Sequence, residues 1–317
     1  MASDFAELCV PSRLTVPPGG DLDGAIYTLL RDGFRVEPEH DGVRCQALLH
    51  RSGWAFAGKT PSSSARPEYA NLSSRLPAVP EALAATAMPL GTLLDGKLVS
   101  ESGWRSILRW LTCASGRLGE ADEPRGAKLI VFDVIAFGSD PTDMWPLAER
   151  GRLLESTAPR TGAAAVSPWR TGDEGLGFAL DLLREPSETT EGIVLKRLDS
   201  PYGGGATKDW LVHRHREVRN GVILDVVEGR GKLRGTAGSV VVGQRFAGGG
   251  LRRVASLDGM TMDQRHYVWR NRRRLVGTVV SFASQGRTES GYRRPRLLCL
   301  MASGDPESCL WEGGAGT

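Results

Sequence analysis

The sequence predicts an α+β protein of two domains, in which a larger domain of antiparallel sheets and helices precedes a small β-barrel. The chain has 317 residues, enough for two separate cores. From Asn220 onward, short strand-like runs separated by glycines replace the more varied pattern before it. Net charge changes at the same place, from −4 over residues 1–219 to +7 over residues 220–317. We therefore expect domains at 1–219 and 220–300, and a disordered glycine-rich tail at 301–317.

The first predicted strands lie between residues 34 and 57. Apolar and polar side chains alternate in short runs at 34–36, 43–49 and 54–57, which is the pattern of half-buried strands. The dipeptide Asp41-Gly42 separates the first two runs. Because Asp-Gly is typical of tight turns between paired strands, these two runs are predicted to form a hairpin.

Three further elements complete the predicted first domain. The apolar run from Ala127 predicts a buried strand. Residues 144–158 predict a helix, because Asp143 can cap it and Pro146 suits its first turn. A second strand is expected at 191–197, before a run of three glycines.

The C-terminal third predicts short strands around one helix. Strand-like runs occur at 222–227, 238–243 and 251–254, a helix is expected over 263–275, and a strand over 276–282. This composition favours a small barrel of the OB type. The basic charge of this third, 15 Lys and Arg against 8 Asp and Glu, indicates a polyanion-binding module.

Composition excludes two classes of protein. No apolar run is long enough to span a membrane, and the N-terminus lacks a secretion signal. The five cysteines form no CxxC pair, so neither a zinc site nor a disulfide framework is expected. The sequence thus predicts a cytoplasmic protein, which we expect to be a monomer.

Six short boxes carry the functional signal. Together, in this order, they resemble the ATP-dependent DNA ligase family, within the covalent nucleotidyltransferases, from about residue 34 to 297. The boxes are Glu-Pro-Glu-His-Asp-Gly-Val-Arg at 37–44, Leu-Leu-Asp-Gly-Lys-Leu-Val at 93–99, Phe-Asp-Val at 132–134, Glu-Gly-Ile-Val-Leu-Lys at 191–196, Trp-Leu-Val-His-Arg at 210–214 and Gly-Tyr-Arg-Arg-Pro-Arg at 291–296.

The resemblance implies a nucleotidyltransferase (adenylation) domain followed by an OB-fold, with ATP and Mg²⁺ or Mn²⁺ as cofactors. It implies that Phe132 packs on the purine, Glu191 holds the divalent ion and Arg293 orients the pyrophosphate. The residues that it places at the nucleotide are Glu37, Glu39, Asp41, Gly42, Arg44, Phe132, Lys196 and Arg214.

The resemblance also implies nicked double-stranded DNA as partner, and roles in DNA repair, recombination and replication. Lys59 falls near the position of an arginine that contacts the 5′-phosphate of the nick. Arg270 and Arg272 lie in a basic run that we expect to face DNA.

The chain departs from the family pattern at its centre. Glu39 stands where the family has its nucleophilic lysine, and Lys97 stands where it has a glutamate. If these two positions lie close together, exchanging opposite charges preserves an ion pair. Val212 replaces a phosphate-binding lysine in the fifth box, which leaves that site one cation poorer.

Three interpretations of this exchange remain open. In the first, Lys97 is a relocated nucleophile, with Arg293 the second catalytic residue, and the protein seals nicks through an enzyme-adenylate and a DNA-adenylate. In the second, a degenerate ligase binds nucleotide and DNA ends without covalent adenylation. In the third, the fold serves another nucleotidyl transfer, such as RNA ligation, capping or adenylation of a small molecule; the last needs no enzyme lysine if the substrate itself attacks the α-phosphate.

Overall fold

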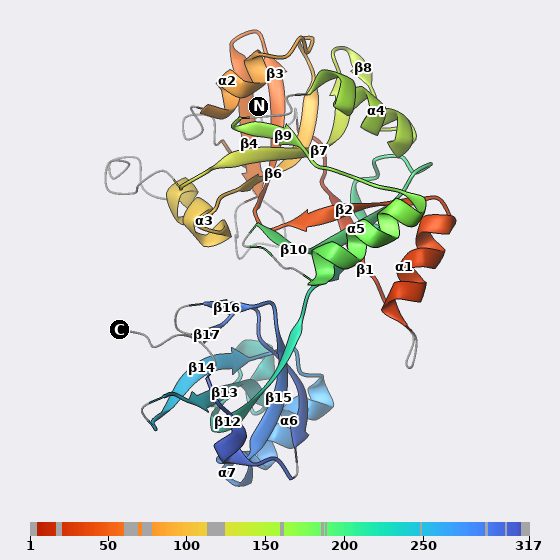
Figure 1. Ribbon diagram of the computed structural model, residues 1–317. Helices are drawn as coiled ribbons and strands as arrows, with labels where there is room; N and C mark the ends of the chain where they lie inside the picture. Colours follow the sequence, from red (N-terminus) through yellow and green to blue (C-terminus); the bar gives the residue numbers. More distant parts are fainter. Residues whose placement is uncertain are drawn as a thin grey trace. The chain divides into compact units, whose positions relative to one another are not determined.

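The chain folds into two compact units, residues 1–214 and 215–317 (Figure 1). The computed structural model describes residues 5–16, 21–59, 69–71, 78–112, 124–158, 162–184, 187, 189–247, 249–288, 291–301 and 303–311. No helix within these ranges is both long and apolar enough to cross a membrane.

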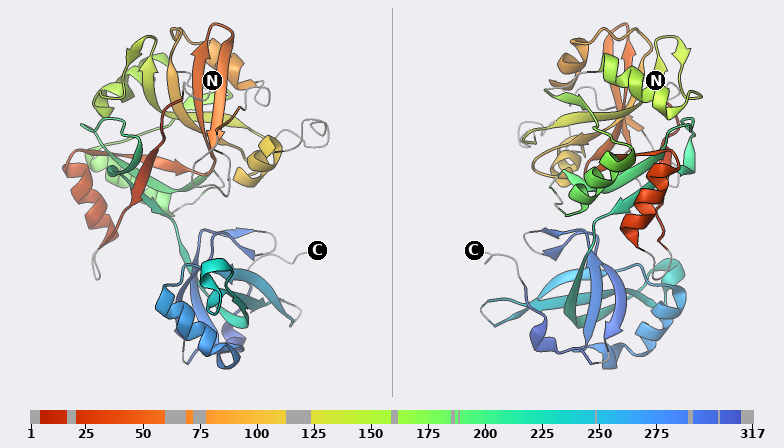
Figure 2. Two further views of the ribbon diagram at one scale, coloured as in Figure 1. Left: turned by 180° about the vertical axis from the view of Figure 1, so that it is seen from behind. Right: turned by 45° about the vertical axis from the view of Figure 1, so that its right-hand side comes forward.

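The first sheet of unit 1 has four strands, backed by two helices. Its order is β1 (Cys9–Arg13), β11 (Gly205–Arg214), β10 (Thr190–Arg197) and β2 (Phe34–His40). Helices α1 (Leu22–Arg31) and α5 (Gly172–Arg184) cover one face (Figures 1 and 2). Asp21 caps α1 by accepting hydrogen bonds from two backbone N–H groups of its first turn.

The second sheet of unit 1 carries a larger apolar core. Its strands, in order, are β5 (Tyr69–Asn71), β4 (Gly53–Lys59), β3 (Val43–His50), β6 (Leu93–Val99), β7 (Lys128–Phe137) and β8 (Asp140–Pro141), with β9 (Ala164–Val166) parallel to β7. Helices α2 (Ala78–Ala84), α3 (Trp104–Thr112) and α4 (Leu147–Thr157) contribute to the core on its outer face.

The two sheets face each other, and strand alternation decides what lies between them. On β6, Leu94 and Leu98 point into the outer core, so Asp95 and Lys97 point to the inner side. A smaller apolar cluster joins both sheets there, formed by Cys9, Leu48, Leu93, Phe132, Ile135, Tyr202 and Trp210. The inner faces therefore carry most of the charged residues of the boxes.

The predicted hairpin at Asp41-Gly42 is wrong. β2 pairs with β10 in the first sheet, whereas β3 pairs with β4 and β6 in the second. The Asp-Gly step is the point where the chain crosses between sheets. A local turn signal cannot reveal which partner each flanking strand will choose, and that is why the sequence misled.

Other predicted elements of unit 1 shift only at their ends. The helix expected at 144–158 begins at Leu147, with Pro146 as its N-cap residue. Asp143 does not cap it; its side chain accepts a hydrogen bond from the N–H of Met144 instead. The strands expected from Ala127 and at 191–197 are β7 and β10.

Unit 2 is built on a five-stranded antiparallel sheet. The order is β14 (Leu251–Leu257), β13 (Ala237–Arg245), β12 (Glu217–Glu228), β15 (Val279–Ser284) and β18 (Arg296–Met301), and β16 (Arg287–Thr288) pairs with β17 (Gly291–Tyr292). A single parallel bridge, Asp258 to Arg296, joins the two edge strands.

Two expectations for unit 2 need correction. The helix expected over 263–275 divides at Asn271 into α6 (Met262–Arg270) and α7 (Arg272–Leu275). Residues 303–311, which fall in the predicted disordered tail, form the short helix η5 (Pro306–Ser308) and bury Trp311 beside Tyr292. The glycines of the tail obscured this apolar anchor; residues 312–317 lie outside the described ranges.

Gly42 is required by the approach of a backbone carbonyl at the sheet crossing. A Cβ at residue 42 would lie 2.2 Å from the oxygen of Leu98. We expect Gly42→Ala to lower the free energy of unfolding by about 3 kcal/mol or more, because the backbone at Leu98 would have to shift to make room for the Cβ. Gly177→Ala in α5 is the matched control, since a Cβ there meets nothing within 4 Å and should stabilise the helix by ~0.5–1 kcal/mol. Urea unfolding of both variants checks this, and equal stability of the two would contradict it.

Candidate functional site

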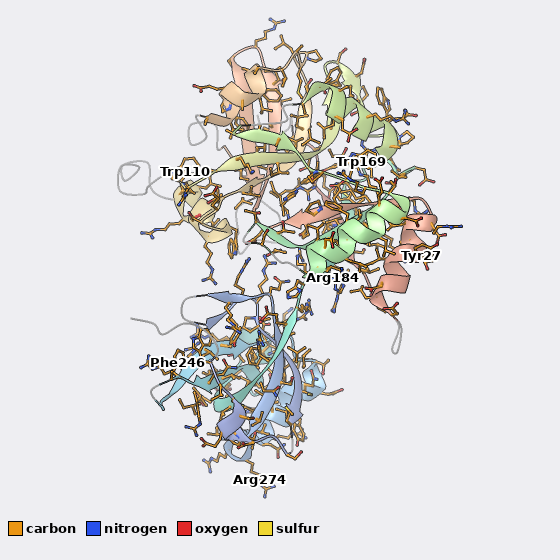
Figure 3. The ribbon with its side chains drawn as sticks, viewed as in Figure 1. Tyr27, Trp110, Trp169, Arg184, Phe246 and Arg274 are labelled. Atoms are coloured by element: carbon orange, nitrogen blue, oxygen red, sulfur yellow. The ribbon has the colours of Figure 1, made fainter. Side chains whose placement is uncertain are left out.

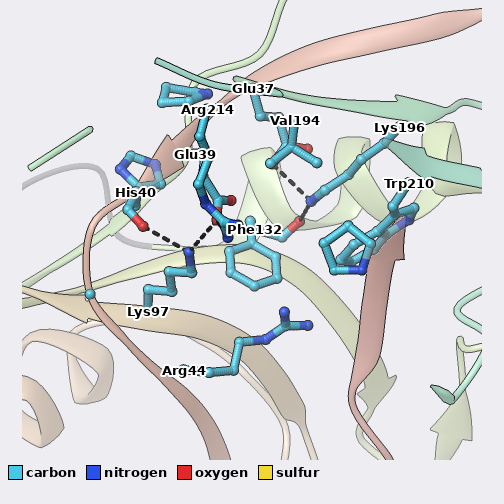
Figure 4. Close-up of a pocket in the computed structure, with 13 residues that line it drawn as sticks. Glu37, Glu39, His40, Arg44, Lys97, Phe132, Val194, Lys196, Trp210 and Arg214 are labelled. Atoms are coloured by element: carbon cyan, nitrogen blue, oxygen red, sulfur yellow. Dashed lines mark hydrogen bonds and ion pairs between the residues drawn. The ribbon is translucent and has the colours of Figure 1, made fainter. Parts of the chain in front are cut away.

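A cavity lies between the inner faces of the two sheets, at the point where the chain crosses between them (Figure 4). Strands β1, β2, β10 and β11 supply one wall, and β3, β6 and β7 the other. The lining residues are Pro11, Glu37, Pro38, Glu39, His40, Gly42, Arg44, Lys97, Phe132, Val194, Lys196, Trp210 and Arg214. Seven of the eight residues predicted at the nucleotide are among them, and so is Lys97.

Glu39 and Lys97 form an ion pair across the two sheets. Lys97 Nζ lies 3.0 Å from Glu39 Oε1 and donates a second hydrogen bond, 2.7 Å long, to the carbonyl of His40. The Lys97 side chain is 15% exposed and that of Glu39 is 7% exposed. Glu39 and Lys97 therefore lie close together, which is the condition under which exchanging their charges preserves an ion pair.

Arg214 joins a second carboxylate to this pair. Its Nη2 lies 2.5 Å from Glu39 Oε1, and its Nε lies 3.0 Å from Glu191 Oε2. Two acids thus face two cations, and the formal charges of these four groups cancel. Arg214, whose side chain is 32% exposed, is the most accessible of the four.

The charges around Glu39 and His40 fix their protonation states. Burial by itself would raise the pKa of Glu39, but the nearby charges of Lys97 and Arg214 outweigh it and lower the pKa to about 2. Burial, reinforced by Lys97, lowers the pKa of His40 to about 3. At neutral pH Glu39 is therefore anionic and His40 neutral; the His40 ring nitrogen Nε2 shares a hydrogen bond with Ser167.

Lys196 occupies the deeper part of the cavity. Its Nζ lies 2.8 Å from Glu37 Oε2, while Arg35 binds the other oxygen of Glu37. The same ammonium sits 4.4 Å from the ring centre of Phe132 and 4.1 Å from that of Trp210. Burial lowers the pKa of Lys196, although the carboxylate of Glu37 opposes that effect.

Sequence reasoning missed the group that holds Arg44 in place. Asp95 accepts hydrogen bonds from Arg44 Nε at 2.7 Å and from Tyr202 at 2.6 Å, and it is fully buried. Arg44 in turn lies over the ring of Phe132 at 4.7 Å. An acid inside the apolar box at 93–99 was the available signal, because a buried charge needs a partner.

Trp210 and Arg35 were also missed. Trp210 closes one side of the cavity from β11, where the sequence drew attention only to the basic positions after it. Arg35 is 2% exposed and binds Glu37 from the same strand. An arginine two residues before a buried glutamate on a strand shares its face, so the alternation itself could have indicated this pair.

Of the other predicted residues, Asp41 and Glu191 are not among those that line the cavity. Asp41 is buried, and its N–H bonds the carbonyl of Thr189 rather than facing the cavity. Glu191 reaches the site through Arg214. Arg293 belongs to unit 2, where its backbone bonds the turn after β15.

The three residues predicted to contact DNA differ in what surrounds them. Lys59 ends β4, and its side chain lies outside what the structure describes. Arg270 is exposed at the end of α6. Arg272 is half-buried: it lies over the ring of Trp269 at 4.2 Å and donates a hydrogen bond to its carbonyl.

The cavity combines an aromatic and aliphatic part with a charged part. Phe132, Val194 and Trp210 offer surfaces on which a flat ring can stack. Lys97 and Arg214 offer cations for an anion, although both contact Glu39 in this state. Within the described ranges, no group of three or more His, Cys, Asp or Glu side chains is arranged to hold a metal ion.

Sequence comparison relates the chain to DNA ligases. No family model matches it. It is 28% identical over 241 residues to a probable DNA ligase of Beutenbergia cavernae, covering 74% of this chain and 42% of that protein. A probable DNA ligase of Streptomyces avermitilis is 29% identical over 241 residues, covering 71% and 44%. The chain thus spans less than half the length of these two curated relatives.

Structural comparison shows the same fold in solved ligase structures. The protein named "Pmar-Lig_Pre." matches 93% of this chain and 67% of its own with a TM-score of 0.67 and 17% identity. A structure from "DNA binding with a minimal scaffold: Structure-function analysis of Lig E DNA ligases" matches 94% and 100%, with a TM-score of 0.59 and 16% identity. In sequence and in fold, the chain is ligase-like.

The pairing of Glu39 predicts how stability depends on pH. Its pKa in the folded chain, about 2, lies below the ordinary value of 4.5, so its contribution to the free energy of unfolding is present above pH 4.5. That contribution is lost as the pH falls from about 4.5 to 2. His40 is neutral in the folded chain, because its pKa there is about 3, below the ordinary value of 6.5. The free energy of unfolding therefore also decreases through His40 as the pH falls from 6.5 to about 3.

Glu39→Gln isolates the first of these effects. We expect it to cost on the order of 2 kcal/mol at pH 7, less than the ~3–5 typical of breaking a fully buried pair, because Arg214 is partly exposed. The difference from the parent chain should shrink at pH 3. Urea unfolding at the two pH values measures it; a difference independent of pH would refute the pairing.

Proposed function

We propose that this chain is an ATP-dependent, DNA-ligase-like nucleotidyltransferase that acts as a cytoplasmic monomer on nicked double-stranded DNA, with Lys97 as the residue that accepts the adenylyl group. The observation that carries the proposal is the position of Lys97. Its ammonium lies in the cavity wall, 3.0 Å from the carboxylate of Glu39, the residue that stands at the family's lysine position. The exchange of charges therefore keeps an amine in the cavity.

The position of Lys97 favours it over the other lysines. Among the lysines with described side chains, only Lys97 and Lys196 line the cavity. Lys196 is 2% exposed and is held by Glu37 beneath two aromatic rings. Lys97 is more open, and an amine must approach to roughly 3–3.5 Å of phosphorus for in-line attack.

The adenylation step has a simple balance. The neutral amine of Lys97 attacks the α-phosphorus of ATP, a P–N bond forms, the P–O bond to pyrophosphate breaks, and the nitrogen loses one proton to solvent. For this attack the Lys97 nitrogen must leave the carboxylate of Glu39, with which it pairs at 3.0 Å, and the carbonyl of His40. Release of Lys97 from Glu39 is therefore the step that the proposal requires.

The cavity residues fit an adenine nucleotide. The ring surfaces of Phe132 and Trp210 suit a purine, and the indole nitrogen of Trp210 is buried without a hydrogen-bond partner among the described residues. Glu37 can accept hydrogen bonds at the base edge, and Arg214 can bind phosphate in a bidentate manner.

We propose Glu191 as the carboxylate that would hold a divalent ion together with the phosphates of the nucleotide. Mg²⁺ is commonly bound by one or two carboxylates together with substrate phosphates, and Glu191 supplies such a carboxylate. When bound, the ion neutralises phosphate charge. Glu191 and Arg214 contact each other in this state, so the carboxylate of Glu191 would have to leave Arg214 to bind the ion.

Unit 2 supports DNA as the partner. We assign it to the OB type, because α6 lies between β14 and β15 and a bridge joins the edge strands. Residues 220–317, which make up nearly all of it, carry a net charge of +7, which favours phosphate backbones. Relatives of the chain bear the name DNA ligase, which supports this choice over a small-molecule substrate.

A second candidate function rests on Arg214. In this state Arg214 contacts both Glu39 and Glu191, and Lys97 is held by two acceptors. A protein that keeps these contacts would bind nucleotide and nicked DNA without forming an enzyme-adenylate. Both candidates share the DNA partner and differ only in covalent chemistry.

Labelling with ATP separates the two candidates. With α-labelled ATP and Mg²⁺, we expect one AMP bound through an acid-labile bond to Lys97, identified by peptide mass spectrometry. Lys97→Met should abolish the label, whereas Lys128→Met, at an exposed lysine of the neighbouring strand, should leave it unchanged. Label on Lys196, or no label on any lysine, overturns the assignment of Lys97.

Reversing the exchange tests whether it limits the reaction. The double change Glu39→Lys with Lys97→Glu keeps the ion pair and restores the family arrangement, so we expect adenylation to rise at least tenfold. Glu39→Lys alone places like charges together and should destabilise the fold, which thermal unfolding checks.

If adenylation by the double variant does not rise, the limiting defect lies instead at Val212, in the phosphate region.

A nick whose 5′-phosphate already carries AMP provides the control for DNA binding. Its sealing needs no enzyme lysine, because the 3′-hydroxyl attacks and AMP leaves.

A further inference from the structure

We propose that the exposed arginines at the α6–α7 corner of unit 2, Arg270, Arg273 and Arg274, form a binding surface for the backbone phosphates of double-stranded DNA. The inference rests on the proposed function for its choice of DNA as the polyanion. It adds a surface in unit 2 and names the residues that make the contacts.

These three arginines lack acidic partners in the part of the chain that the structure describes. All three are exposed, and none lies within ion-pair distance of a described carboxylate. Arg274 points away from the body of unit 2 (Figure 3). Three unneutralised cations within five residues repel one another, so a polyanion that binds them relieves that repulsion.

The corner is held rigidly, which suits a binding surface. Val268 on α6 and Leu275 on α7 are buried in the core of unit 2. Asn271, between the helices, donates a side-chain hydrogen bond to the carbonyl of Tyr267. The arginines therefore lie on fixed elements and lose little backbone freedom when they bind.

Arg272 belongs to this support rather than to the contact surface. Its guanidinium lies over the ring of Trp269 at 4.2 Å and donates to the Trp269 carbonyl at 2.8 Å. It is half-buried, whereas its neighbour Arg273 is exposed. The sequence run predicted contacts for Arg270 and Arg272; the packing assigns the role of the latter to Arg273 and Arg274.

Stabilisation of helix ends alone does not account for the cluster. Cations near a helix C-terminus are favourable, and Arg270 occupies the last turn of α6. The effect is confined to one turn, and α7 has only four residues with three arginines in it. One arginine in the last turn would be enough to stabilise the C-terminus of the helix.

Strand register separates this surface from Arg293. The first residue of β15, Val279, lies opposite Val222, and its last, Ser284, lies opposite Glu217, where the chain enters unit 2. α7 precedes β15, whereas Arg293 bonds the turn that follows it. The α6–α7 arginines and the backbone of Arg293 therefore lie at opposite ends of β15, on the order of 20 Å apart along the strand.

Paired variants test the surface in the full-length chain. Binding of a labelled nicked duplex would be measured by fluorescence anisotropy at several salt concentrations. We expect Arg273→Gln with Arg274→Gln to lower the slope of log affinity against log salt by about 2, close to ~0.9 per lost phosphate contact.

Arg252→Gln with Arg253→Gln is the matched control, because it removes two adjacent exposed arginines from β14 of the same unit. Its slope should equal that of the parent chain. Arg272→Lys should keep the slope but lower the melting temperature, as expected of a residue that positions others.

The outcomes separate this proposal from the proposed function. If the parent chain binds with a steep salt dependence and the two double variants have equal slopes, the α6–α7 surface is refuted while DNA binding stands. If the affinity of the parent chain is indifferent to salt, the DNA partner itself is refuted. Melting curves of each variant show whether a lost slope reflects a lost fold.

Discussion

The architecture of unit 1 depends on pairing the charges that lie between its two sheets. Because side chains alternate along a strand, each inner-facing position of the boxes must find its partner in a space with little water. The solutions are shared: Asp95 serves Arg44 and Tyr202, and Glu39 serves Lys97 and Arg214. An ion pair forms equally well whichever strand supplies the acid and whichever supplies the base. The exchange at positions 39 and 97 therefore still leaves both charges paired.

The same pairing limits reactivity. A lysine held by a carboxylate and a carbonyl is fixed in position, and its nitrogen is engaged by both acceptors instead of being open to a further partner. Arg214 is the member of the group that a ligand reaches most easily, because its side chain is the most exposed. It contacts both Glu39 and Glu191. Any anion that draws Arg214 away from Glu39 strengthens the remaining hold of Glu39 on Lys97. Withdrawal of Arg214 from Glu39 and release of Lys97 are thus opposed within one cluster.

Sequence predicted the strands and the gathering of the boxes, because period-two alternation and short spaced motifs are local signals. Seven of the eight residues expected at the nucleotide line the cavity, and Glu39 meets Lys97. The sheet crossing at Gly42 escaped, because strand partners are chosen by residues far away in the chain. The anchoring of Trp311 escaped because a glycine-rich composition outweighed one aromatic side chain. The roles of Arg293 and Lys59 remain predictions from resemblance.

The ion pair between Glu39 and Lys97 also restricts how this sequence can change over generations. Either single replacement by the opposite charge sets two like charges about 3 Å apart in a partly dry space. A lineage can therefore leave the present arrangement only by two coordinated changes, or by passing through a less stable protein. The ion pair thus couples the acceptable residues at two positions that lie 58 apart in the sequence.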